Sequence, residues 1–185
     1  MTNNIVIPTK SENIDTYAVR LKDLIDIIKE RTNKPKVNII AHSMSGLVAR
    51  RYVQIFRSQD VDKIIIIATP NHGISSSAES YCGYVGKNRE CQDMLQNSLS
   101  INKLNDPSKQ PSNLRIYSVI GQGCATDNTD RDDVVATESA KLENAKLFYV
   151  NGACDEFFGN VLHTDILKID EYPQTYKIIK EILKE

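Results

Sequence analysis

The chain has 185 residues, the length of one domain with a sizeable core. It carries 23 Lys and Arg residues against 24 Asp and Glu residues, for a net charge of -1, and no segment gathers basic residues into a stripe. This balance argues against a nucleic-acid partner. No apolar run approaches the length of a membrane span, and the first residues lack the basic start and long apolar stretch of a signal peptide.

Two apolar periods alternate along the chain. Five short apolar runs are typical of strands: residues 4–8, 37–41, 62–68, 114–120 and 147–150. Three longer stretches repeat apolar residues every three or four positions, as helices do: residues 13–32, 47–56 and 172–183. Because the two kinds of segment alternate, we predict an α/β domain with a mainly parallel sheet of about five strands and flanking helices.

Residues 74–112 interrupt this alternation. The segment is rich in Ser, Asn, Gly and Pro, with only a weak helical stretch at residues 93–104. A connection this long between two strands is more often a functional cover than a plain turn. We therefore predict a single domain, residues 1–185, with residues 74–112 as a lid or cap. A solvated insertion without a role in binding is the alternative.

Residues 37–51 read VNIIAHSMSGLVARR and lead from a strand through small residues into a helix. A nucleophile elbow needs a serine on a strained strand-to-helix turn, with small residues two positions away on either side. Ala41 and Ser45 occupy those positions around Ser43, where glycine is usual, and Gly46 follows. Ser43 is therefore the candidate nucleophile.

This segment resembles the lipase branch of the α/β-hydrolases, in which a strand ending in His-Ser-Met precedes a helix that starts Gly-Leu-Val-Ala-Arg. Residues 64–73, IIIIATPNHG, look like the next strand and the Thr-Pro-x-x-Gly loop of that family, and residues 132–142 look like its acid-bearing segment. The family would have further strands and a glycine-bearing oxyanion loop upstream, but no glycine precedes Gly46. The resemblance thus implies an N-terminally truncated α/β-hydrolase fold, either a fragment or a shortened form. Its open sheet edge would favour self-association.

The family's triad follows the chain order Ser, acid, His. Of the three histidines, His163 lies after the last strand and before the last helix, where the resemblance places the base. His42 adjoins the nucleophile and His72 precedes the covering segment. We expect packing or a local hydrogen bond from each of these two.

Four carboxylates after residue 120 are candidates for the acid: Asp127, Asp130, Asp132 and Asp133. The family pattern has an acid two residues ahead of a β-branched pair, which fits Asp132 before Val134 and Val135. Asp130 and Asp133 stay open as alternatives, because only one carboxylate can orient the imidazole.

The implied activity is hydrolysis of an acyl ester or lipid without a metal or organic cofactor. Ser43 would attack the carbonyl, His163 would carry the proton and Asp132 would hold the imidazole. The amide of Met44, after the nucleophile, would donate to the oxyanion. A thioesterase or acyltransferase could use the same triad. The absent glycine loop also allows a hydrolase-fold protein that binds lipid or a partner without turnover.

The four cysteines match no zinc or Cys-x-x-Cys spacing, and all fall in predicted loops. We predict one disulfide between Cys82 and Cys91, which would brace the covering segment. A second, between Cys124 and Cys154, would join the loops that carry the acid and the base. Such pairs imply an oxidising compartment, whereas four reduced thiols would indicate a cytosolic protein.

Overall fold

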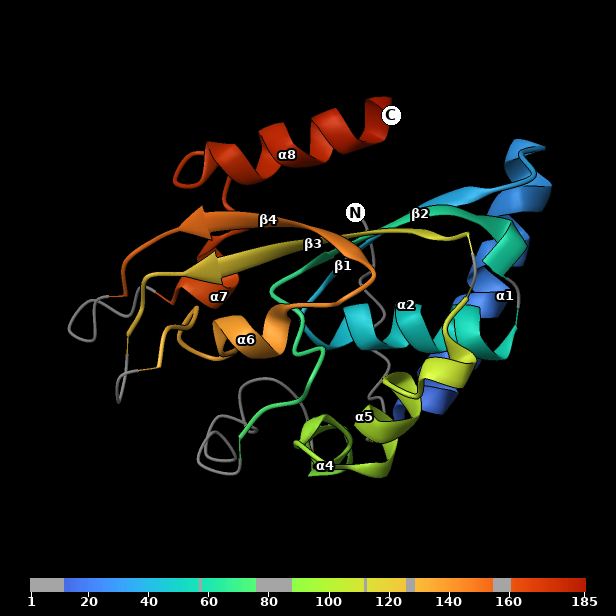
Figure 1. Cartoon of the computed structure of the whole chain (residues 1–185). Coiled ribbons are helices and arrows are strands. Elements are labelled where there is room, and N and C mark those ends of the chain that lie inside the picture. The colour runs from blue at the N-terminus through green and yellow to red at the C-terminus, as the bar shows by residue number, and fades with distance from the viewer. Residues whose placement is uncertain (1–11, 57, 76–87, 112, 126–128, 155–160) are drawn as a thin grey trace, which may run out of the picture.

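The computed structural model describes residues 12–56, 58–75, 88–111, 113–125, 129–154 and 161–185. A parallel sheet in the order β1-β2-β3-β4 lies at its centre (Figure 1). Its strands are β1 (Val37–His42), β2 (Val61–Ile67), β3 (Arg115–Gln122) and β4 (Ala145–Asn151). Within the described residues the sheet thus has four strands, where the sequence predicted about five. The fifth candidate, residues 4–8, lies outside the described residues.

Helices cover both faces of this sheet. The helices of the described chain are α1 (Ile14–Thr32), α2 (Met44–Ile55), α4 (Asn88–Met94), α5 (Leu99–Leu104), α6 (Thr137–Ala140), α7 (Leu162–Asp165) and α8 (Pro173–Lys184), with short 3-10 turns η1 (Ser58–Asp60) and η3 (Pro107–Lys109). Helix α8 lies over one face, whereas α1, α2 and α6 lie over the other (Figure 1). Across the described ranges, no helix combines the length and the apolar character needed to cross a bilayer.

Strand β2 is buried from both sides, which explains its four consecutive isoleucines. Ile64 and Ile66 pack with residues of α1 and α2, while Ile65 and Ile67 pack with residues of α7 and α8. A strand between two helical layers has no solvated face, so its pattern is a continuous apolar run instead of an alternation.

Local signals set the ends of α1. Asn13 precedes it, and its side chain accepts a hydrogen bond from the Thr16 amide at 2.8 Å. Asn33 follows it in the left-handed conformation, with φ of 51°, which is a common helix terminus. The buried residues Ala18 and Ile25 join α1 to the sheet.

The segment after β2 docks on α1 and α2. An apolar cluster joins these helices to α4 and α5, and includes Ile14, Leu47, Met94, Ile101 and Leu104. The amide of Ile14 also donates to the Asp93 carboxylate at 2.9 Å. The described part of residues 74–112 is thus packed against the domain. Its role as a cap stays a prediction.

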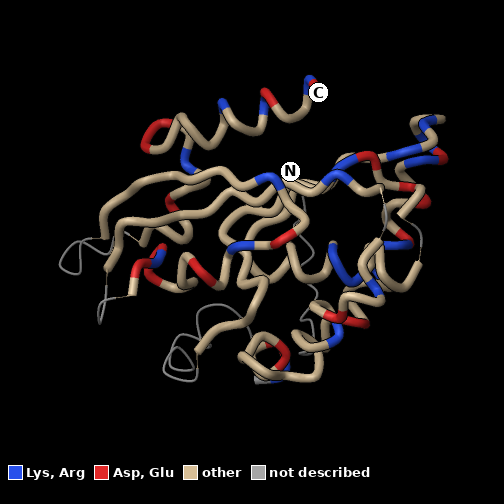
Figure 2. Tube along the Cα trace, in the orientation of Figure 1, with Lys and Arg blue, Asp and Glu red and all other residues tan. Residues whose placement is uncertain are grey.

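Charged residues of both signs alternate along the surface elements, and few lie within the central strands (Figure 2). Strand β1 is at one end of the described sheet. Self-association along that edge stays a prediction.

Candidate active site

Ser43 lies in the turn between β1 and α2 with φ of 54° and ψ of -131°, a conformation that is strained for a residue with a side chain. Three hydrogen bonds hold this turn. The Ser43 amide donates to the carbonyl of Ile67 at 2.9 Å, and the Ser43 carbonyl accepts from the Gly46 amide and the Thr69 hydroxyl, both at 3.0 Å. The neighbouring strand and its following loop therefore keep the serine in this conformation.

Sequence reasoning assigned no role to Thr69, although its loop was part of the family resemblance. Thr69 is fully buried, and its hydroxyl contacts the backbone of the candidate nucleophile. The sequence signal for Thr69 was its position at the start of the Thr-Pro-Asn-His-Gly loop, two residues after the end of β2, the strand that pairs with β1.

The candidate nucleophile, base and acid form a continuous hydrogen-bonded chain. His163 Nε2 lies 2.9 Å from Ser43 Oγ, and His163 Nδ1 lies 2.9 Å from Asp132 Oδ2. Because a carboxylate only accepts, Nδ1 carries the proton and Nε2 is left to accept from the serine hydroxyl. His163 is 2% exposed and Asp132 is 1% exposed, so their interaction is shielded from water.

The Asp132 carboxylate is held on its other oxygen as well. Its Oδ1 accepts from the amides of Val134 at 3.1 Å and Val135 at 2.7 Å. The Asp132 carbonyl accepts from the His163 amide at 2.8 Å. A Cβ on Gly121 of β3 would lie 2.8 Å from the Asp132 Cβ, so a glycine is needed for this approach. The acid loop thus fits closely against β3 and His163.

The alternative carboxylates occupy other positions. Asp130 Oδ1 accepts from the Gly123 amide at 2.7 Å, and its Oδ2 accepts from the Thr137 hydroxyl at 3.2 Å, so this side chain stabilises the loop. Asp133 has a left-handed φ of 86° within the turn after Asp132. Asp127 lies outside the described residues.

The remaining histidines differ from each other. His42 Nε2 lies 2.7 Å from the His163 carbonyl, and the two rings are 4.9 Å apart between centroids. Burial, and then the proximity of His163, hold the pKa of His42 below its ordinary value. His72 is exposed, and its Nδ1 lies 3.4 Å from Asn105 Nδ2. His42 is therefore part of the site and His72 is not.

A disulfide joins Cys124 and Cys154, as the sequence predicted. These cysteines lie just after β3 and β4, on the loops that lead to Asp132 and His163. The bond is compatible with an oxidising compartment. Cys91 is also disulfide-bonded, and Cys82, its predicted partner, lies outside the described residues.

Met44 is the first residue of α2, so its amide is one of the helix N–H groups without an intrahelical acceptor. Its role as an oxyanion donor stays a prediction. In the part of the chain that the structure describes, no group of three or more His, Cys, Asp or Glu side chains could hold a metal ion.

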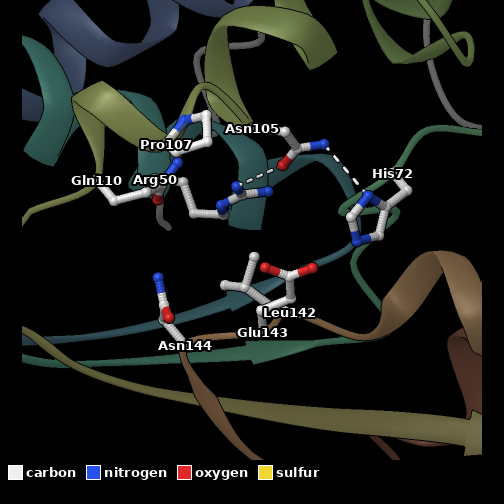
Figure 3. A pocket seen from close by; sticks show the side chains of 8 residues that line it. All are labelled: Arg50, His72, Asn105, Pro107, Gln110, Leu142, Glu143 and Asn144. Atoms are coloured by element: carbon white, nitrogen blue, oxygen red, sulfur yellow. Dashed lines mark hydrogen bonds between the residues drawn. The ribbon is translucent and has the colours of Figure 1, made fainter.

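A pocket of about 180 Å³ lies beside α2 (Figure 3), lined by Arg50, His72, Asn105, Pro107, Gln110, Leu142, Glu143 and Asn144. Arg50 is 3% exposed, and its guanidinium donates to the Asn71 and Leu104 carbonyls and to the Asn71 and Asn105 side-chain oxygens. Burial lowers its pKa to about 10. Since neutral protein oxygens already accept from this guanidinium, Arg50 ties α2 to the end of α5 and to the loop after β2.

Comparison with known families and structures is consistent with this architecture. The family profile described as PGAP1-like alpha/beta domain matches residues 12–181. No curated protein matches the sequence.

Among solved structures, the mature lipase BlEst2 of Bacillus licheniformis superimposes with a TM-score of 0.70 at 14% identity, over 94% of this chain and 75% of the lipase. MGS-MChE2, an alpha/beta hydrolase enzyme from a metagenome of Mar Chica lagoon sediments, gives 0.53 at 14%, over 97% and 73%. The phospholipase PlaB of Legionella pneumophila gives 0.56 at 16%, over 73% of this chain and 35% of that one. At these identities the likeness shows the shared α/β-hydrolase fold.

Proposed function

This chain belongs to the PGAP1-like alpha/beta domain family, and on that premise we propose that it is a serine hydrolase of acyl esters, with lipids as the substrate class. The observation that supports the proposal most is the chain of two 2.9 Å contacts from Ser43 through His163 to Asp132. These residues are far apart in sequence and meet at the carboxyl end of a parallel sheet, where α/β folds place their sites. The fold shared with a lipase and a phospholipase supports the choice of lipid esters.

In this proposal, His163 Nε2 takes the Ser43 proton while Oγ forms a bond to the ester carbonyl carbon. Asp132 stabilises the imidazolium, and the Met44 amide donates to the developing oxyanion. The alcohol then leaves with the proton from His163, which breaks the ester C–O bond and leaves an acyl group on Ser43. Water activated by the same histidine releases the acid and restores the serine.

A fluorophosphonate probe tests this proposal because it reacts with activated serines. We expect labelling of the wild-type protein at Ser43, no labelling of Ser43→Ala, and hydrolysis of p-nitrophenyl esters by the wild type alone. A folded wild-type protein with an unlabelled Ser43 would overturn the proposal in favour of a binding protein without turnover.

Two parallel assays identify the reaction more closely. A thioester of matched acyl length, cleaved faster than the oxygen ester, would identify a thioesterase. Transfer of the acyl group to an added alcohol in preference to water would identify an acyltransferase. We expect the oxygen ester and water to be preferred.

A further inference from the structure

The backbone of His163 is held on both sides of its imidazole. Its N–H donates to the Asp132 carbonyl at 2.8 Å, and its C=O lies 2.7 Å from His42 Nε2. A carbonyl only accepts, so His42 Nε2 carries a proton and donates it. Both peptide groups next to the His163 side chain therefore have a fixed partner.

The second of these partners adjoins the candidate nucleophile. His42 ends β1 and Ser43 follows it directly. The backbone of His42 is also held in place. Its N–H donates to Ser45 Oγ at 3.1 Å, and the Ser45 hydroxyl donates to the His42 carbonyl at 2.5 Å. Two successive residues thus contact His163. His42 contacts the His163 backbone carbonyl, and Ser43 contacts the His163 ring nitrogen Nε2. A shift of the His163 backbone would disturb both contacts.

The charge state of His42 suits this position. Its ring centroid lies 4.9 Å from that of His163, which becomes a cation when it takes the serine proton. A charged neighbour at this distance would oppose that step. Burial and the proximity of His163 both favour neutral His42, which still has the N–H that the His163 carbonyl needs.

We propose that His42 is a positioning residue, whose neutral imidazole holds the His163 backbone so that His163 Nε2 stays within hydrogen-bonding distance of Ser43 Oγ. The inference rests on the hydrolase function proposed above. His42 acts through His163 and not on the substrate, so its loss lowers kcat and leaves KM nearly unchanged.

Three substitutions of His42 distinguish the effect of its hydrogen bond to the His163 carbonyl from the effect of its side-chain volume. The Gln amide nitrogen can reach the place of His42 Nε2, the shorter Asn amide cannot, and Leu has no donor. We expect His42→Gln to keep kcat within about twofold of the wild type. We expect His42→Asn and His42→Leu to lower kcat by about tenfold, because the His163 backbone then loses one hydrogen bond and His163 Nε2 is no longer held toward Ser43 Oγ. His72→Leu, at the exposed histidine outside the site, is the matched control and should leave kcat unchanged.

The melting temperature of each variant is measured as well, so that kcat is compared only between folded proteins. Wild-type kcat in both His42→Asn and His42→Leu would overturn the inference. A folded His42→Gln protein as slow as His42→Leu would also overturn it, because restoring the donor would then not restore the rate. If instead the wild type itself neither labels nor hydrolyses esters, the proposed hydrolase function fails, and this result is distinct from the other two.

Discussion

Gly46 and Thr69 approach so closely that a side chain on residue 46 has no space. A Cβ placed on Gly46 would lie 2.1 Å from Thr69 Oγ1 and 2.7 Å from Thr69 Cγ2. The same Thr69 hydroxyl donates to the Ser43 carbonyl. In this elbow, Gly46 leaves the space that Thr69 needs to hold the Ser43 carbonyl. The usual glycine positions are filled by Ala41, which is buried, and by Ser45, whose hydroxyl donates to the His42 carbonyl.

Gly46→Ala should destabilise the domain and disturb the elbow. Overpacking of a buried contact costs about 1 to 3 kcal/mol, and urea unfolding measures it. Thr69→Val keeps the shape but removes the hydrogen bond, and should cost about 1 kcal/mol. In a double-mutant cycle, Thr69→Ala should relieve part of the Gly46→Ala cost because it removes the two closest atoms. Strictly additive free energies of unfolding would contradict this contact.

Ser43 and His163 should behave as one catalytic unit. Ser43→Ala and His163→Ala should each remove nearly all ester hydrolysis, and the double variant should lose little more, because neither residue works without the other. The measurement is kcat/KM on a short-chain ester, with melting curves as a control for folding. If the double variant lost the product of the two single effects, the residues would be acting independently.

Asp132 and Asp130 form a matched pair for identifying the acid. Asp132→Asn should abolish turnover, since Asp132 alone of the two contacts His163. Asp130→Asn should keep turnover but reduce stability, because the Asp130 carboxylate accepts from Gly123 and Thr137. Asp133→Asn should also keep turnover. An inactive Asp130→Asn beside an active Asp132→Asn would show that the acid is assigned wrongly.

Much of the fold follows from local sequence patterns. The buried run in β2 and the helical spacing of α1 depend on residues close together in the chain, so their positions could be predicted within a few residues. The elbow at Ser43 is equally local. The four strands of the described sheet match four of the five apolar runs that the sequence offered.

The contacts around the site depend on residues that are distant in sequence. The His42 hydrogen bond reaches a residue 121 positions away, and no spacing signals it. The burial of Arg50 could not be predicted either, because a charged residue is expected at the surface. Its burial depends on oxygens that α5 and the loop after β2 supply. Such roles become visible only when the folded chain brings these groups together.

The Cys124–Cys154 disulfide should stabilise both the domain and its candidate site. It closes a loop with a sequence separation of 30, for which chain entropy gives about 3 to 4 kcal/mol. The paired change Cys124→Ser and Cys154→Ser should lower the free energy of unfolding, measured by urea titration, by this amount. It should also reduce ester hydrolysis, since the bond joins the loops of Asp132 and His163. This variant is preferable to a reducing agent, which would also act on the disulfide of Cys91. Unchanged stability and rate would contradict the role of the disulfide.

His42 should make the folded protein sensitive to acid. Its folded-state pKa lies below the ordinary 6.5, chiefly because burial disfavours the cation and secondly because His163 is near, while the hydrogen bond to the His163 backbone and the charge of Asp132 act in the opposite direction. As the pH falls through 6.5, the unfolded chain takes up a proton at this histidine before the folded protein does. The free energy of unfolding therefore decreases toward acid pH.

His42→Gln removes that titration and keeps a donor, so its melting temperature should fall less than that of the wild type between about pH 7.5 and pH 5. His163 and Asp132 are present in both proteins, and the difference between the two curves isolates residue 42. Thermal melts at matched ionic strength across this range give the comparison. Parallel curves for the two proteins would show that the folded state places no penalty on charging His42.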